Sequence, residues 1–156
     1  MHHRTAGRRI KLIGVGSPVA GDELGWRFVE ALARENLAGL WPGAAVECLT
    51  LDRPGSLLLQ AWRDCDLALL FDAAPELDAP WRELSLAELR QAGRAAGSHG
   101  FGVAEAVALA TRLGCLPEEG VRVIGLGAAA EARDWLRAQI LEAVLKKEPG
   151  SLGRPG

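Results

Sequence analysis

The chain has 156 residues, of which 49% are hydrophobic and 24% charged, and its formal net charge is −2. This length suits one domain with a single core. The near-neutral charge offers no basic surface to nucleic acid or to a membrane, and the longest apolar runs are too short to span a bilayer. The apolar stretch after the basic N-terminus is short and interrupted by Lys11, so a secretory signal is not expected.

We therefore expect a single cytoplasmic domain over residues 1–156, with flexible tails at 1–8 and 148–156. Strand and helix patterns alternate from end to end. The expected strands are 9–15, 44–51, 66–72, 121–126 and an edge strand at 81–86. The expected helices are 24–37, 55–64, 86–93, 103–113 and 129–146, with an ordered loop at 94–102. This alternation predicts a three-layer αβα domain around a twisted, mostly parallel sheet of about five strands.

The three cysteines, Cys48, Cys65 and Cys115, form no CxxC pair. An odd, sparse set in a cytoplasmic chain indicates reduced thiols in or near the core. No basic partner is placed beside any of them by the sequence, so a catalytic thiol is not predicted.

The first polar segment of interest is the loop GVGSPVAGDE at 14–23. A dinucleotide fingerprint requires glycine at position 19, where the chain has Val19, and the Gly-Lys-Ser/Thr of a phosphate-binding loop is absent. The loop ends instead in Asp22 and Glu23, directly before a predicted helix. These acids are either helix-capping residues, which favour the helix dipole, or ligands at the end of the first strand.

Two further candidates come later in the chain. Asp72 ends the most apolar predicted strand, and His99 lies in a glycine-rich segment, the single histidine outside the N-terminal pair. In a parallel α/β sheet, the loops that carry Glu23, Asp72 and His99 are expected at one edge. One imidazole and two carboxylates suit nickel or zinc and leave coordination positions open. Such a set is better suited to completing the coordination of a metal than to holding it alone.

At these places the chain resembles the hydrogenase maturation proteases. Their opening pattern, Gly-x-Gly-Asn-x-Leu-x-x-Asp-Asp/Glu-Gly-x-Gly, is matched in part by Gly14 to Gly25, and their metal-facing acid falls on Glu23. Their Asp-Ala motif is matched by Asp72-Ala73, and their segment Ser-His-Gly-Phe-Gly-Leu-Ala-Glu-Ala by residues 98–106. The likeness covers roughly residues 9–127, with the motifs in matching order.

The resemblance implies an endopeptidase that trims the C-terminal extension of a nickel–iron hydrogenase large-subunit precursor. Glu23, Asp72 and His99 are then the residues that recognise nickel already inserted in that precursor. On this view the metal arrives with the substrate, and no organic cofactor is expected. The implied partner is the precursor alone, without nucleic acid or membrane.

The chain departs from the family pattern in two places near the site. Ser17 replaces the usual asparagine, and the glycine that normally follows the second acid is missing. A one-residue deletion rotates the helix start by about 100° relative to the loop, which makes Asp22 an alternative to Glu23.

Two other functions remain open from the sequence. A nucleotide-binding α/β domain would use the turn at Gly14 to Gly16, although Asp22 and Glu23 would repel a pyrophosphate. A non-catalytic binding protein would sense nickel in the precursor without cutting it. A separate nickel or copper site is possible at Met1-His2-His3, through the terminal amine, backbone nitrogens and His3.

Overall fold

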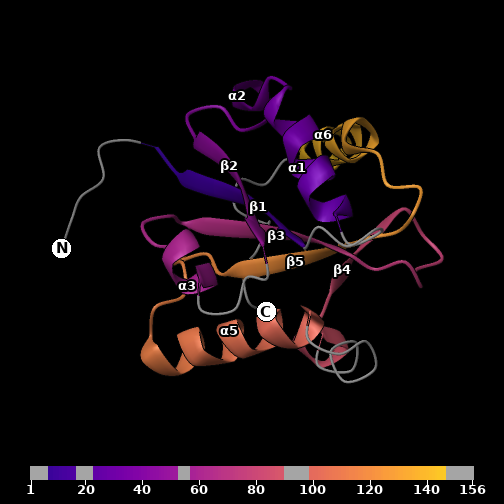
Figure 1. Ribbon diagram of the computed structural model, residues 1–156. Helices are drawn as coiled ribbons and strands as arrows, with labels where there is room; N and C mark the ends of the chain where they lie inside the picture. The colour runs from indigo at the N-terminus through magenta and orange to yellow at the C-terminus, as the bar shows by residue number, and fades with distance from the viewer. Residues whose placement is uncertain (1–6, 17–22, 53–56, 90–98, 147–156) are drawn as a thin grey trace.

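The computed structural model describes residues 7–16, 23–52, 57–89 and 99–146, with only the backbone described at 99–101 and 141–146 (Figure 1). Its sheet has five strands in the order β2-β1-β3-β5-β4. The bounds are β1 Arg9–Gly16, β2 Ala45–Asp52, β3 Leu67–Ala73, β4 Trp81–Leu84 and β5 Val121–Leu126. Four strands are parallel, and β4 pairs antiparallel with β5 at one edge. The predicted sheet, including the edge strand near residue 81, is confirmed.

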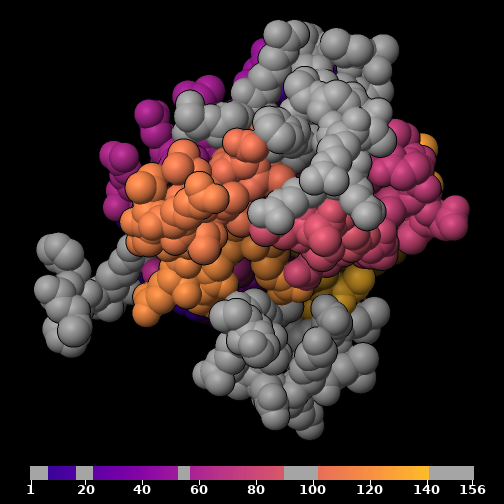
Figure 2. All heavy atoms as spheres, turned by 90° about the horizontal axis from the view of Figure 1, so that it is seen from below, coloured from indigo at the N-terminus to yellow at the C-terminus, as the bar shows by residue number. Residues whose placement is uncertain are grey.

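Helices cover both faces of this sheet. On one face lie α1 (Leu24–Ala33), α2 (Leu37–Leu40) and α6 (Ala132–Lys146). On the other lie α3 (Leu57–Ala61) and α5 (His99–Leu113), and Figure 2 views the molecule from the α5 side. The predicted three-layer αβα architecture is therefore confirmed. In the described part of the chain, no helix combines the length and apolar character needed to cross a bilayer.

The helix predicted over 24–37 is wrong at its C-terminal end. Helix α1 stops at Ala33, and the backbone N–H groups of Arg34 and Glu35 bond three residues back, to Ala31 and Leu32. The chain then restarts as the short helix α2. The break lets Leu37 and Trp41, each 8% exposed, turn into the core beside α1, which a continuous helix would not allow.

The N-terminal boundary of α5 also differs from the prediction. The helix begins at His99, within the segment predicted to be a loop through residue 102. The glycines at 100 and 102 suggested a break, because each costs about 1 kcal/mol in a helix relative to alanine. Packing of Val103, Ala104 and Ala106 against β3 and β5 outweighs that cost. Helix α3 ends at Ala61, earlier than the predicted residue 64. Residues 86–89 are helical as predicted, and the rest of that predicted helix, 90–93, lies outside the described residues.

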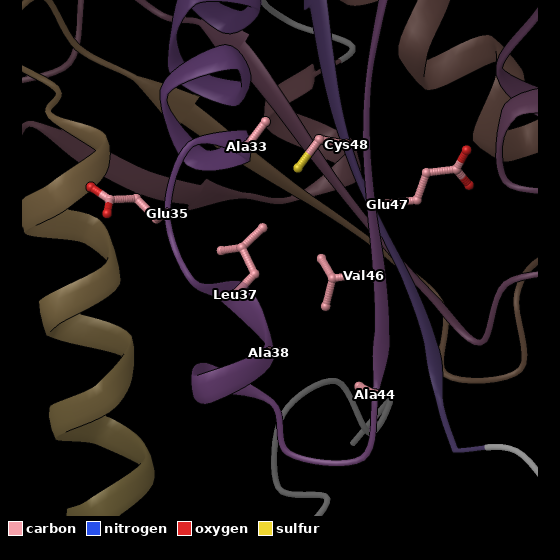
Figure 3. Close-up of a pocket in the computed structure, with 8 residues that line it drawn as sticks. All are labelled: Ala33, Glu35, Leu37, Ala38, Ala44, Val46, Glu47 and Cys48. Atoms are coloured by element: carbon pink, nitrogen blue, oxygen red, sulfur yellow. The ribbon is translucent and has the colours of Figure 1, made fainter.

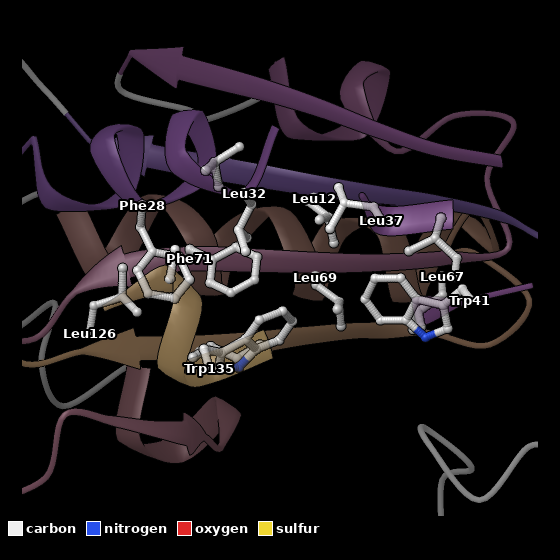
Figure 4. Close-up of a cluster of buried hydrophobic side chains, with 14 residues drawn as sticks. Leu12, Phe28, Leu32, Leu37, Trp41, Leu67, Leu69, Phe71, Leu126 and Trp135 are labelled. Carbon is white, nitrogen blue, oxygen red and sulfur yellow. The ribbon is translucent and has the colours of Figure 1, made fainter. Parts of the chain in front are cut away.

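The core on the α1 side is built around three aromatic rings (Figure 4). Phe71 of β3 stacks on Phe28 of α1 with ring centroids 5.1 Å apart, and it meets Trp135 of α6 edge-on at 5.2 Å. Phe28 and Trp135 also contact, at 6.2 Å. Each ring is at most 3% exposed. Such pairs stabilise by about 0.5–1.5 kcal/mol beyond their buried area, so Phe71 is held from both sides. The next residue in the strand is Asp72.

Candidate functional site

The strand order creates a topological switch point between β1 and β3. After β1 the chain crosses on the α1 face to β2 on one side, and after β3 it continues through β4 and α5 to β5 on the other side, with α5 on the opposite face. The two connections leave neighbouring strands in opposite directions, so a crevice forms beyond their carboxyl ends. Ligands of open α/β sheets bind in that crevice. Asp72 lies at the carboxyl end of β3, and Glu23 comes after β1 in the chain, directly before α1.

Two glycines bring helix α1 unusually close to the sheet at this point. A Cβ added to Gly25 would lie 2.4 Å from the carbonyl oxygen of Phe71 and 2.5 Å from that of Val15. A Cβ added to Gly14 would lie 2.4 Å from the carbonyl oxygen of Gly25. The first turn of α1 therefore rests directly on the backbones of β1 and β3. Glu23, two residues before Gly25, is thereby fixed beside the end of β3.

Asp72 is 8% exposed, and it is the one charged residue buried within the described ranges. Strand alternation places its side chain on the same face as Ala68 and Leu70, which pack toward α5, and opposite to Phe71. Removing a carboxylate from water has a free-energy cost that apolar residues at this position would avoid. A buried acid at the carboxyl end of a central strand is therefore a strong candidate for chemistry.

Glu23 is the N-cap residue of α1, but its side chain makes no capping hydrogen bond. Its backbone carbonyl accepts from the Arg27 N–H at 3.1 Å. Its carboxylate accepts a charge-assisted hydrogen bond from Arg27 Nη2 at 2.5 Å, across one helical turn. The Glu23 side chain is 34% exposed and that of Arg27 71% exposed. The capping interpretation is thus wrong for this side chain, which is held in an ion pair beside the crevice.

His99 is the first residue of α5, and its side chain lies outside the described residues, as does the whole of Asp22. The fifteen residues of α5 rise about 22 Å, close to the length of β5 at about 20 Å. Because α5 leads back to the start of β5, its N-terminus lies near the edge where β5 ends (Figure 1). The backbone thus brings residue 99 to the same sheet edge as Glu23 and Asp72. Their joint role as ligands stays a prediction.

The predicted ligands form a mixed set of nitrogen and oxygen donors. Among the described side chains, no three His, Cys, Asp or Glu gather into a metal-binding group. The three predicted ligands would supply two carboxylates and one imidazole, a set suited to nickel or zinc with open positions. To bind a metal, the Glu23 carboxylate must break its ion pair with Arg27 and coordinate the incoming cation instead.

The contribution of Arg27 was missed by the sequence analysis, although the signal was present. An acid four residues before an arginine on a helix is a recognised pairing distance. Trp26 was likewise missed: its indole N–H donates to the Leu51 carbonyl at 2.8 Å and ties the start of α1 to the end of β2. These contacts, with Gly25, fix where the predicted acid lies.

The cysteines are free thiols, as predicted, with Cys65 buried and Cys48 half-buried; the predicted position in or near the core is wrong for Cys115, which is exposed. Burial raises the pKa of the Cys48 thiol, and the neighbouring Glu47 carboxylate raises it further. A raised pKa means less thiolate below that pKa, so reaction with an alkylating agent is slowed.

We expect iodoacetamide at pH 8 to label Cys48 at least about 10-fold more slowly than Cys115, with the gap narrowing as the pH rises through the Cys48 pKa. Peptide mapping after timed quenching measures both rates in one sample. Equal rates at pH 8 would contradict the described burial of Cys48.

Comparisons with known proteins bear on the fold. No protein-family model and no curated protein matches the sequence. Among solved structures, the hydrogenase maturating endopeptidase HybD from Escherichia coli superposes with a TM-score of 0.60 at 20% identity, over 89% of this chain and 93% of that one. An endopeptidase from the same species, solved in solution, gives 0.59 at 20% identity, over 88% and 90%.

A [NiFe] hydrogenase maturation protease, HycI from Thermococcus kodakarensis, gives a TM-score of 0.51 at 18% identity, over 92% of this chain and 96% of that one. At sequence identities of 18–20%, a structural similarity is evidence for the fold alone. The family resemblance drawn from the motifs is therefore confirmed at that level: the chain has the fold of the hydrogenase maturation endopeptidases.

Proposed function

We propose that this protein is a member of the hydrogenase maturation proteases and removes the C-terminal extension of a nickel–iron hydrogenase large-subunit precursor after nickel insertion. The observation that supports this most directly is Asp72, a buried carboxylate at the switch point of this fold. Nickel is then part of the substrate, and the site of action is the cytoplasm.

In this proposal Glu23, Asp72 and His99 bind the nickel of the precursor and so hold the adjoining peptide bond at the sheet edge. Asp22 is the alternative acid. Water adds to the scissile carbonyl, the C–N bond breaks, and the leaving amine takes up the proton. A carboxylate of the site is the group that accepts the proton of the attacking water. Holding the bond in place supplies much of the rate enhancement.

The direct experiment measures the intact mass of a nickel-loaded precursor after incubation with the protein. Loss of one C-terminal peptide, with nickel and not without it, is the expected result. His99→Ala should abolish that loss. A variant lacking residues 1–7 should cleave like the wild type, because His2 and His3 are not among the proposed nickel ligands. An unchanged mass despite formation of a complex would instead indicate a non-catalytic binder.

Nickel binding by the free protein gives a second, independent test through Arg27. The Arg27 guanidinium both occupies the Glu23 carboxylate and repels a cation. We expect Arg27→Gln to tighten Ni²⁺ binding to the protein lacking residues 1–7 by about 3- to 10-fold, because both effects are removed. Isothermal titration calorimetry measures the dissociation constant. Arg34→Gln, a solvent-exposed arginine two turns further along, is the control for net charge. Weaker binding in Arg27→Gln would mean that Arg27 aims Glu23 into the site rather than holding it back.

The nucleotide-binding alternative is not supported by any feature of the described residues. The acid Glu23 stands at the start of α1, where a phosphate would have to bind.

A further inference from the structure

Strand β2 forms the edge of the sheet opposite to β4. None of the described strands pairs with its outer side. Ala45 donates its backbone N–H to the Arg8 carbonyl at 2.8 Å, so alternate residues from Ala45 onward bond to β1. The backbone groups of Val46, Cys48 and Thr50 therefore point outward along the edge. Unpaired groups in a row of this kind are a template for an added strand.

A groove of about 500 Å³ runs beside this edge, between β2 and the chain around α1 and α2 (Figure 3). Val46 and Cys48 face it from the strand, and Ala33 and Leu37 face it from the helical side. An added strand would direct every second side chain into the groove. The apolar lining favours small or aliphatic side chains at those positions.

Two carboxylates flank the groove (Figure 3): Glu35 points from its helical side toward α6, and Glu47 lies on the face of β2 opposite to Val46 and Cys48. Glu47 is 63% exposed and lies 3.9 Å from Lys11, whose ammonium group donates instead to the carbonyls of Ala61 and Arg63, at 2.7 and 3.0 Å. Glu35 lies 3.3 Å from Arg133, which is 76% exposed. Such exposed pairs contribute little, about 0–1 kcal/mol. The exposed Glu47 carboxylate at the strand edge therefore remains suited to a cationic side chain of a ligand.

The groove is also within reach of the candidate site. Strand β2 ends at Asp52, opposite Gly16 of β1, so its carboxyl end lies at the same edge as Asp72. A strand added to β2 would lie three strand spacings, about 15 Å, from β3. Four or five extended residues span that distance.

From this edge, its apolar groove and the Glu47 carboxylate we propose that the C-terminal extension of the precursor binds as an additional strand along β2, with apolar side chains facing the groove and a basic side chain on the opposite face beside Glu47. The inference rests on the proposed protease function. The cleaved bond lies at the carboxyl edge, and the extension continues away from it. The extension must then run toward the amino end of β2, antiparallel to it.

A second copy of the chain is a poorer occupant of this edge. Antiparallel pairing of two β2 strands centred near Glu47 would bring the Glu47 carboxylates of the two copies beside each other. Like charges facing each other across paired strands are destabilising. A basic segment meets no such repulsion.

Cys48 makes the proposal measurable, because it lies in the groove while exposed Cys115 lies outside it. The probe is a synthetic peptide with the sequence of the precursor extension. At saturating peptide we expect the alkylation rate of Cys48 to fall at least 5-fold, on the order expected for a half-buried site that becomes covered, with Cys115 unchanged. Unchanged alkylation of Cys48 at about 1 mM peptide, a concentration that reveals even weak binding, would overturn the proposal.

Two pairs of variants test how the peptide is held. Thr50→Pro removes an outward N–H without removing a bond to β1, so protection of Cys48 should require at least about 10-fold more peptide. Thr50→Val keeps the N–H and should behave as wild type.

Glu47→Lys should weaken peptide binding more than Glu105→Lys, which changes the net charge equally but lies on the exposed surface of α5. Equal affinities within either pair would overturn strand addition or the charge preference, respectively.

Precursor cleavage separates this inference from the protease role. If wild type and Thr50→Pro process the nickel-loaded precursor with the same KM, the docking mode is wrong and the protease function stands. If the peptide protects Cys48 while wild type leaves the precursor intact, the edge is a binding site and the protease function fails. If Cys48 becomes protected without peptide as the protein concentration rises, and sedimentation shows a dimer, the occupant is a second copy.

Discussion

Replacing Gly25 by alanine is expected to destabilise the protein by about 2–4 kcal/mol, although alanine is the better helix former. Gly25 lies in the first turn of α1, where its replacement should gain up to about 1 kcal/mol from helix propensity. The added methyl group would lie 2.4 and 2.5 Å from the carbonyl oxygens of Phe71 and Val15. Both are sheet backbone atoms, which cannot turn aside as a side chain could. The steric cost therefore exceeds the propensity gain.

Gly39→Ala is the matched control, since it places the same methyl group in another helix of the same chain. A Cβ at Gly39 would meet only the Asn36 side chain, at 3.4 Å, and the residue is exposed. We expect Gly39→Ala to be neutral or stabilising by up to about 1 kcal/mol. Urea denaturation followed by tryptophan fluorescence gives both free energies of unfolding. A stable Gly25→Ala variant would show that α1 does not rest on β1 and β3 as described.

The same substitution has a consequence for function. If α1 shifts outward to relieve the contact, Glu23 moves away from the end of β3. Cleavage should then fall further than the remaining folded fraction explains. Measuring the precursor cleavage rate per folded molecule, in conditions where the variant is folded, separates the two effects.

Much of this fold could be predicted from the sequence because its signals are local. The apolar run at 67–71 requires a strand covered on both faces, and the alternation of strands and helices requires parallel pairing. The edge position of Asp72 follows from the same rules. The break between α1 and α2 could not be predicted, because it depends on burial of Leu37 and Trp41 by residues distant in sequence.

Within the site, the direction of the Glu23 side chain could not be predicted from the local sequence pattern either. The pattern places an acid at a helix start, and capping and metal binding both fit that position. Its pairing with Arg27 follows from the backbone conformation at Glu23, with φ −93° and ψ 2°. The spacing of four residues signals this pair, but where the pair lies relative to β3 depends on the close approach of Gly25 to the sheet, which no local pattern encodes.

Asp72→Asn is expected to reduce nickel-dependent precursor cleavage at least about 100-fold while leaving the fold intact. The amide is nearly the same size as the carboxylate but carries no charge, and it is a poor metal ligand and a poor base. The free energy of unfolding should change by only about 1 kcal/mol, because the amide fills the same space and carries no charge that burial would penalise. The rate is measured from the intact mass of the precursor over time.

The control is Asp66→Asn, because Asp66 precedes the same strand at its opposite end. Its carboxylate accepts the Arg9 backbone N–H at 2.7 Å, an arrangement that ties β1 to β3 on the side away from the switch point. Asp66→Asn should cost a similar small amount of stability and leave cleavage unchanged. If the two variants lost activity equally, the loss would reflect the integrity of β3. Loss in Asp72→Asn alone assigns the chemistry to the carboxyl edge, because the strand, the substitution and the change in charge are the same in both.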